Sequence, residues 1–392
     1  MSQAFIVAAV RTAGGRRNGR LSGWHPVDLA ARVLDDLLDR SGADPALVED
    51  VFMGCVSQIG EQANNVARNA VLASHLPLSV PGTSIDRQCG SSQQALHFAA
   101  QAVMSGAMDV VIAAGVESMT RVPMLSPVTL AQKAGLGNYQ CDTINKRFGG
   151  VVFSQFTGAE MLARQFRLER SQLDAYALES HLRAAAATQQ GRFQAEILPL
   201  EARLADGSRP GGLHAQDEGI RADATLQSIG AVKLLQEGGT ITAANASQIC
   251  DGASGVMIVN ERGLRALGVA PLARIHHMTV LGSDPVIMLE TPIPATQRAL
   301  QRSGLGIADI DLYEVNEAFA PVPLAWLQAL EADPARLNVN GGAIALGHPL
   351  GASGTRLMAT LVHALRARGG RYGLQTMCEG GGMANVTIVE RL

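Results

Sequence analysis

The 392-residue sequence is poor in aromatic and charged residues and has no long hydrophobic run. Its longest apolar stretches, such as Ala4 to Val10 and Val110 to Ala114, fall far short of the ~20 residues that a membrane-spanning helix needs. Aromatic residues make up 4% and charged residues 17% of the chain, whereas hydrophobic residues reach 47%. These values exclude a membrane span and a disordered chain. They predict a large globular protein of roughly two to three core-sized units.

The sequence also lacks an excess of charge of one sign. Lys and Arg number 32, Asp and Glu number 35, and the net charge of -3 is spread along the chain. Such a balance argues against a general nucleic-acid binder. At the start, the apolar run precedes the arginines, which reverses the order of a secretory signal, and the final Glu-Arg-Leu is no peroxisomal address. We therefore expect a cytoplasmic protein.

Cysteine is scarce and shows no metal-binding or redox spacing. The sequence has five cysteines, an odd number, and no C-x-x-C pair: Cys55, Cys89, Cys141, Cys250 and Cys378. This pattern predicts free thiols without structural zinc or a disulfide framework. One of these thiols is a candidate nucleophile.

The order of strand-like and helix-like segments predicts an α/β fold. Short β-rich runs alternate with alanine-rich helical patterns, and the apolar run DVVIAAG is typical of a strand buried on both faces, close to the centre of a sheet. We expect strands at 5–10, 50–55, 109–115, 255–260, 273–280 and 311–315, with a final strand-rich segment at 374–392. Helices are expected at 26–40, 64–73, 89–106, 157–165, 171–191, 294–304 and 318–331.

Two features of the pattern predict the domain organisation. Between 121 and 247, Pro, Gly, Gln and charged residues interrupt the α/β pattern, which indicates an inserted loop domain. In addition, Cys89 and His348 are each followed by small residues, a helix, a glycine-containing turn and a strand, which indicates two related halves. The predicted units are 1–120 with 248–271, 121–247, and 272–392.

Cys89 is the strongest candidate nucleophile. It directly precedes the predicted helix that opens with Gly90-Ser91-Ser92, and a helix N-terminus favours a thiolate, so the position predicts a lowered pKa. The alternative is a small buried core residue, because free cysteine is among the most buried residue types.

Three further segments offer groups that can assist a thiol. His348 lies in a glycine-rich stretch and can act as a base, with a helix cap or a core histidine as the alternative. Cys378 precedes a glycine run beginning at Gly380, whose backbone N–H groups can bind an oxyanion. Asn316 follows a predicted strand and thus lies where α/β sheets form sites, unless it only caps the next helix.

Other motifs do not predict a cofactor site. His276 and His277 are neighbours on a predicted strand and therefore point to opposite faces, which prevents them from sharing a metal. No phosphate-binding G-x-x-x-x-G-K-[ST] loop is present. A group of early arginines is expected in a solvated loop or a subunit contact, with an acidic ligand as the alternative: Arg11, Arg16, Arg17 and Arg20.

Together, four blocks of the sequence resemble the signature blocks of the thiolases. These are RQCGSSQQA around Cys89, VNEAFA at Asn316, GGAIALGHPLGASG around His348 and CEGGGMA at Cys378, in the family's order over essentially the whole chain. The resemblance implies a five-layered αβαβα sandwich of two similar halves, in which the loop domain covers the coenzyme A site. It also implies a homodimer or a homotetramer that binds acyl-CoA and CoA.

The resemblance implies a mechanism without a bound cofactor or metal, in which coenzyme A is a co-substrate. His348 helps to deprotonate Cys89, whose thiolate attacks a 3-ketoacyl-CoA, while Cys378 transfers the protons. The N–H groups of Cys89 and Gly380 would form one oxyanion hole, and His348 with a water on Asn316 the other. The resemblance further places four residues near coenzyme A, Arg221, Ser228, Ala243 and Ser247, and two in the acyl pocket, Met288 and Phe319.

Three departures from the family pattern affect what is expected. Asp86 stands where many members have Asn, and its carboxylate is expected to raise the Cys89 pKa unless Arg87 or Arg121 pairs with it. Glu379 is charged where short-chain biosynthetic members tend to be apolar. Ser154 and Gln155 replace the His-Met pair of those members. These departures favour a thiolase for longer or differently shaped acyl groups.

Two alternatives remain open. One is a strict acetoacetyl-CoA thiolase, and the other is a non-catalytic thiolase-like protein that binds acyl-CoA or lipid. The second predicts the loss of a reactive residue, and none is lost. The ketoacyl-synthase branch of the same fold is disfavoured by the cysteine of the CEGGG block.

Overall fold

The computed structural model describes residues 2–392 and contains one large mixed sheet. Its strands follow the order β11-β12-β13-β10-β1-β9-β5-β3-β4, with β2 beside β9 and β6 beside β1. The N-terminal strands are β1 (Phe5–Thr12), β2 (Gly15–Arg16), β3 (Asp50–Gly54), β4 (Gly82–Ile85), β5 (Val110–Ser118), β6 (Ile197–Leu198) and β9 (Cys250–Val259). The C-terminal strands are β10 (Ala273–Gly282), β11 (Leu312–Val315), β12 (Tyr372–Glu379) and β13 (Met383–Glu390). A separate two-stranded sheet joins β7 (Leu200–Glu201) to β8 (Leu213–His214).

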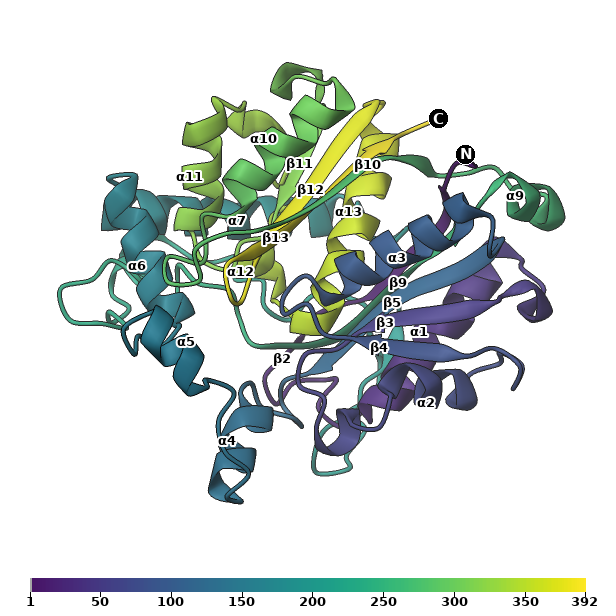
Figure 1. Ribbon diagram of the computed structural model, residues 1–392, viewed down its shortest axis with the longest axis horizontal. Helices are drawn as coiled ribbons and strands as arrows, with labels where there is room; N and C mark the ends of the chain where they lie inside the picture. Colours follow the sequence, from purple (N-terminus) through teal and green to yellow (C-terminus); the bar gives the residue numbers. More distant parts are fainter. Residues whose placement is uncertain (1) are drawn as a thin grey trace.

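The larger helices form three layers around the two halves of this sheet. Figure 1 shows α3 and α13 between the halves, α1 and α2 outside the N-terminal strands, and α10 and α11 outside the C-terminal strands. Their bounds are α1 (Pro26–Ser41), α2 (Val66–Ala73), α3 (Ser91–Ser105), α10 (Pro292–Ser303), α11 (Pro321–Leu330) and α13 (Ser353–Arg368). The short helices α9 (Glu261–Leu267) and α12 (Ala343–Leu346), and the 3-10 turns at 45–47, 60–62, 307–309, 334–336 and 350–352, connect the larger elements.

Buried side chains fill the spaces between these five layers. One cluster joins α1 and α2 to the N-terminal strands, including Leu34 and Met257, and another joins α3 and α13 to both halves, including Leu96 and Met358. A third cluster lies between the C-terminal strands and α10, α11 and the inserted segment. The predicted αβαβα sandwich is therefore confirmed.

The two halves repeat the same sequence of elements. In the N-terminal half α3 leads into β5, which pairs with β9 and β3, and in the C-terminal half α13 leads into β12, which pairs with β13 and β11. The halves meet where β1 and β10 pair through only Phe5 with Arg274 and Ile6 with Ala273. The internal similarity seen in the sequence thus corresponds to a repeated arrangement in space.

Most predicted elements agree with the observed ones to within a few residues, and local chemistry explains their ends. Helix α1 starts at Pro26, where the ring presets a helical backbone angle, and His25 accepts a hydrogen bond from the N–H of Val27 at 3.2 Å. It ends at Gly42, which has φ 62°. The helix expected from Ala318 begins only at Pro321, since the preceding residues form the turn that follows β11.

The segment 121–247 differs from the rest of the molecule, as its composition predicts. It contains the helices α4 (Ser126–Lys133), α5 (Asp142–Arg147), α6 (Gln155–Gln165), α7 (Arg170–Gln189) and α8 (Leu226–Gly230), but only two-residue strands. Strand β6 attaches this segment to the main sheet, since Arg11 and Thr12 pair with Ile197 and Leu198. Figure 1 shows α4 projecting away from the layered body.

One prediction about the early arginines is wrong. Arg11 is fully buried on β1, where its guanidinium pairs with Glu196 at 2.6 Å and with Asp217 at 2.8 Å. A buried arginine needs such paired carboxylates, because burial of an isolated charge is costly. Arg16 and Arg17, by contrast, are exposed as expected. Across residues 2–392, no helix is both long and apolar enough to cross a bilayer.

Candidate active site

Cys89 lies in a tight turn immediately before α3. The turn is fixed by hydrogen bonds from the N–H of Gly90 to the carbonyl of Arg87 and from the N–H of Ser91 to the carbonyl of Gln88, at 3.1 and 3.0 Å. The Ser91 hydroxyl also accepts from the N–H of Arg87 at 2.9 Å. The half-buried thiol of Cys89 is thus held on a rigid turn two residues ahead of the helix.

The hairpin between β12 and β13 brings a second thiol to Cys89. Cys378 is buried near the end of β12, and the turn that follows contains Gly381 and Gly382, both with positive φ. Burial raises the pKa of the Cys378 thiol well above its usual value, and Cys89 adds to this, whereas the backbone N–H of Gly380 lowers the pKa of Cys89. The structure therefore places Cys89, Cys378 and Gly380 near one another.

His348 and Asn316 form a second group. The Nε2 atom of His348 lies 3.4 Å from the amide nitrogen of Asn316, and its Nδ1 atom lies 2.5 Å from the Ser353 hydroxyl at the start of α13. Both residues are buried. Asn316 is not the cap of α11, which begins five residues later, and His348 has polar partners on both ring nitrogens. The alternative of a helix cap is therefore wrong for Asn316, whereas His348 is a buried histidine with polar partners.

The fold places these two groups at the same end of the central layer. Strands β11 and β12 are parallel, and Val315 of β11 lies opposite Thr376 of β12. Asn316 directly follows Val315, and Cys378 lies two residues after Thr376, so both residues are at the carboxyl ends of these strands. The starts of α3 and α13 contact each other through a 3.0 Å hydrogen bond from the N–H of Thr355 to the Ser92 hydroxyl. The segments that precede these helices, with Cys89 and His348, therefore converge, although no hydrogen bond joins His348 to Cys89 among the described residues.

The expected lowering of the Cys89 pKa is wrong. Burial raises the pKa of the Cys89 thiol to about 12, and the Glu379 carboxyl group raises it as well. The N–H groups of Cys89 and Gly380 act in the opposite direction with smaller effect. Burial, with help from the Arg356 guanidinium, lowers the pKa of His348 to about 3. In the free protein the proton therefore stays on sulfur, and the imidazole is neutral and able to accept it.

The carboxylate that affects Cys89 is also not the one expected. Asp86 is exposed and accepts hydrogen bonds from the backbone and side chain of Gln88 at 2.8 and 3.2 Å. Neither proposed arginine pairs with it, and Arg121 instead pairs with Glu61. Glu379 is completely buried beside Cys378 and is the carboxyl group that raises the Cys89 pKa most, and Glu117 raises it to a smaller extent.

The predicted coenzyme A contacts all lie in the last part of the inserted segment. Three of them are exposed, namely Arg221, Ser228 and Ala243. Ser228 forms a capping box with Thr225 at the start of α8. Ser247 is half-buried and donates its N–H to the carbonyl of Ala318 at 2.9 Å. This bond ties the segment to the Asn316 block.

The two predicted acyl-pocket residues lie in a common hydrophobic cluster. Met288 and Phe319 are both buried there, and Met288 has a φ of 57°. The ring of Phe319 contacts Phe156 edge-on, with ring centroids 5.6 Å apart. Phe156 follows the Ser154-Gln155 pair, and Ser154 itself caps α6 by accepting from the N–H of Thr157 at 3.4 Å. The sequence analysis singled out Ser154 and Gln155, but the aromatic contact with Phe319 is made by Phe156.

Sequence reasoning also missed residues that hold the predicted ones in place. The Arg356 guanidinium donates to the carbonyls of Leu346 and Gly347, both at 2.6 Å, directly before His348. Buried Glu117 accepts from the N–H groups of Val56, Ser57 and Gly351. An arginine eight residues after the histidine, between the glycine-rich block and the apolar run that follows it, is a signal that would have identified Arg356.

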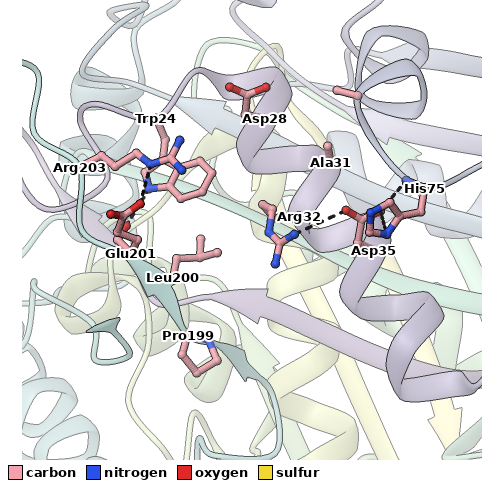
Figure 2. A pocket seen from close by; sticks show the side chains of 11 residues that line it. Trp24, Asp28, Ala31, Arg32, Asp35, His75, Pro199, Leu200, Glu201 and Arg203 are labelled. Atoms are coloured by element: carbon pink, nitrogen blue, oxygen red, sulfur yellow. Dashed lines mark hydrogen bonds and ion pairs between the residues drawn. The ribbon is translucent and has the colours of Figure 1, made fainter. Parts of the chain in front are cut away.

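A surface groove lies away from these residues. It has a volume of about 470 Å³ and lies between α1, the end of α2 and the segment 199–203. Figure 2 shows the Arg203 guanidinium next to the Trp24 ring, 3.7 Å from its centroid, and Arg32 directed toward Asp35. None of the predicted site residues lines the groove.

The two adjacent histidines of β10 have other partners. His276 packs against the Tyr372 ring, and His277 lies 3.0 Å from the Thr279 hydroxyl. Within the part of the chain that the structure describes, no group of three or more His, Cys, Asp or Glu side chains is arranged to hold a metal ion.

The family model of the thiolase N-terminal domain matches residues 4–262, and that of the thiolase C-terminal domain matches residues 269–391. The chain belongs to the thiolase family and is an acyltransferase.

Its relatives include enzymes named for 3-ketoacyl-CoA. The steroid 3-ketoacyl-CoA thiolase FadA6 of Mycobacterium tuberculosis is 50% identical over 100% of this chain and 95% of its own length. The 3-ketoacyl-CoA thiolases of Pectobacterium carotovorum and Vibrio cholerae are each 42% identical over 100% of both chains. The chain is therefore similar to such enzymes along its whole length.

Proposed function

We propose that the protein catalyses the thiolytic cleavage of a 3-ketoacyl-CoA to acetyl-CoA and a shortened acyl-CoA, or the reverse Claisen condensation, within fatty acid or lipid metabolism. The single observation that supports this most strongly is the proximity of two thiols, Cys89 and Cys378, to the backbone N–H of Gly380. Full-length similarity to enzymes named 3-ketoacyl-CoA thiolase supports the substrate class.

In the proposed reaction, the neutral His348 imidazole accepts the Cys89 proton as the sulfur attacks the 3-keto carbon. The C2–C3 bond then breaks, which leaves the acyl group on Cys89 and releases an acetyl-CoA enolate that takes a proton from the Cys378 thiol. In the second half, coenzyme A gives its thiol proton to Cys378 and attacks the acyl-Cys89 thioester. The shortened acyl-CoA leaves, and Cys89 recovers its proton from His348.

Two oxyanions form along this path and need donors. The N–H groups of Cys89 and Gly380 are proposed to stabilise one, because both favour negative charge at the Cys89 sulfur by lowering its pKa. His348 and a water molecule bound to Asn316 are proposed to stabilise the other oxyanion. The 3.4 Å distance between His348 Nε2 and the Asn316 amide nitrogen supports this pairing. The reaction as proposed uses no bound cofactor or metal, and coenzyme A takes part as co-substrate.

The segment 121–247 is proposed to be a loop domain that covers coenzyme A, between a half formed by 1–120 with 248–271 and a half formed by 272–392. Coenzyme A would lie near Arg221, Ser228, Ala243 and Ser247, which is supported by the exposure of three of them. The acyl group would reach Met288 and Phe319. We also propose a homodimer or homotetramer, on the family resemblance, and a cytoplasmic protein, since all five cysteines are free.

The test is the identity of the acylated residue. With a 3-ketoacyl-CoA and no free coenzyme A, peptide mass spectrometry is expected to find the acyl group on Cys89 alone among the five cysteines. Cys378→Ala should still form some acyl-Cys89 but should not turn over, because the nucleophile remains and the proton carrier is lost. Cys141→Ala, which removes an exposed thiol, is the matched control and should behave as wild type. Acylation of Cys378, or of no cysteine, would overturn the proposed roles.

A further inference from the structure

Glu379 is a buried carboxyl group for which the proposed reaction has no use. Its side chain is fully buried, yet neither carboxyl oxygen has a hydrogen-bond partner. The backbone N–H of Asn385 in β13 favours the ionised form of Glu379 but forms no hydrogen bond with either carboxyl oxygen. A buried polar group without partners costs free energy, so its presence beside a reactive thiol calls for a function.

The carboxyl group packs directly against the turn that holds Cys89. A Cβ atom placed on Gly90 would overlap the Oε1 atom of Glu379, so only glycine fits after Cys89 with this carboxyl group in place. Strand alternation explains the contact, because Cys378 and Glu379 are neighbours on β12 and point to opposite faces. Glu379 therefore faces the central layer at the start of α3.

The charged and titratable groups around Glu379 are few. Arg87 on the Cys89 turn favours the ionised form of Glu379, although no ion pair joins the two among the described residues. Glu379 in turn adds to the burial that raises the pKa of the Cys89 and Cys378 thiols. Glu117 on β5 is the other carboxyl group that acts on Cys89, but four donors satisfy it, the N–H groups of 56, 57 and 351 and the Gln62 amide. Among the carboxyl groups of residues 2–392, Glu379 alone combines burial, missing partners and contact with this turn.

We propose that Glu379 is a positioning residue that acts through Cys89: it packs under the Cys89–Gly90 turn, and the charge state of its carboxyl group controls how readily Cys89 forms a thiolate. The catalytic importance of this control rests on the proposed role of Cys89 as nucleophile, whereas the control of its thiol reactivity does not. When protonated, Glu379 adds no charge near the sulfur. When ionised, Glu379 places its negative charge beside the Cys89 sulfur and thereby disfavours the thiolate.

Burial raises the pKa of Glu379 to about 8, which defines where the effect should appear. Below that pH the carboxyl group is neutral, and Cys89 reacts as if no charge were present. Above it, the carboxylate holds back thiolate formation. The reactivity of Cys89 should consequently rise less steeply with pH in the wild type than in a variant without the carboxyl group.

The experiment measures the alkylation rate of Cys89 by iodoacetamide from pH 6.5 to 9.5, followed by peptide mass spectrometry, and needs no turnover. Glu379→Gln should match wild type near pH 7 and react about tenfold faster at pH 9.5, since one pKa unit is a factor of ten. If the Glu379→Gln variant does not fold, Glu379→Met serves as a second neutral variant. Glu379→Asp, which keeps the charge, should retain the wild-type pH profile.

Asp86→Asn provides the matched control, because Asp86 is the exposed carboxylate of the same turn, and its alkylation profile should equal wild type at every pH. A variant-to-wild-type ratio for Glu379→Gln that does not change with pH would indicate a purely structural residue and overturn the proposal. If Cys89 were never acylated by substrate but its alkylation still showed the pH-dependent ratio, the proposed function would fail and this inference would stand.

Discussion

Replacement of Arg356 by methionine should damage both the stability and the activity of the protein. The Arg356 side chain is only 7% exposed and lies on α13, one helix turn beyond Ser353. Its guanidinium donates to the carbonyls of Leu346 and Gly347 and to Asp217, at 2.6, 2.6 and 2.9 Å. Methionine fills a similar volume but donates nothing.

The cost can be worked out from these contacts. Asp217 keeps two hydrogen bonds from Arg11 and one from the N–H of Gly14, so it is not left without partners. The two carbonyls lose their donor, and each unsatisfied buried group costs about 1–3 kcal/mol, or about 4 kcal/mol for both. At about 2.1 cal/mol/K per residue, the unfolding entropy of a chain this size is ~0.8 kcal/mol/K, so Tm should fall by about 5 °C.

The same change should slow the reaction. The released carbonyls directly precede His348, and a displacement of the imidazole by about 1 Å is enough to cost a hundredfold in rate. Loss of the Arg356 charge should also raise the pKa of His348, because that charge helps to lower it. Thiolysis kinetics and a thermal melt are the measurements, with Arg366→Met, an exposed arginine of the same helix, as control. If Arg356→Met matched that control in Tm and kcat, the argument would be refuted.

Two further predictions concern the oxyanion site and the acyl pocket. Asn316→Ala should lower kcat by about a hundredfold without a complete block, because a single oxyanion contact is worth about 3 kcal/mol; wild-type kcat would exclude this role. In a panel of 3-ketoacyl-CoAs, kcat/KM should rise from acetoacetyl-CoA to a medium-chain or branched substrate, since Ser154-Gln155 leaves room and each buried methylene contributes about 0.8 kcal/mol. A maximum at acetoacetyl-CoA would instead favour the strict short-chain alternative.

The order of elements could be predicted because it depends on local patterns. The continuous apolar run Val110 to Ala114 lies in β5, a strand buried on both faces. Helix α1 begins at a proline and ends before a glycine, as those residues favour. The four blocks around Cys89, Asn316, His348 and Cys378 were likewise found from residue type and spacing, and the fold brings their segments together.

The electrostatics of the site could not be predicted in the same way. Helix position alone gave the wrong direction for the Cys89 pKa, because the direction depends on burial and on Glu379, which lies 290 positions later in the chain. Similarly, Arg11 was expected in solvent, yet its partners Glu196 and Asp217 come from the inserted segment. Desolvation and pairing are properties of the packed chain, and a sequence pattern does not encode them directly.

The central layer of the fold contains a buried polar network beside its hydrophobic cluster, and this network helps to explain how the two halves hold one site. Between α3 and β13, the Gln93 amide donates to the Thr387 hydroxyl at 2.8 Å, His97 lies 2.8 Å from the same hydroxyl, and Asn385 donates to Gln94 at 3.1 Å. Burial lowers the pKa of His97 to about 3, so the network is neutral. Apolar packing is non-directional and tolerates sliding, whereas hydrogen bonds fix relative position. Because α3 follows Cys89 and β13 follows the Cys378 hairpin, these bonds set the distance between the two thiols.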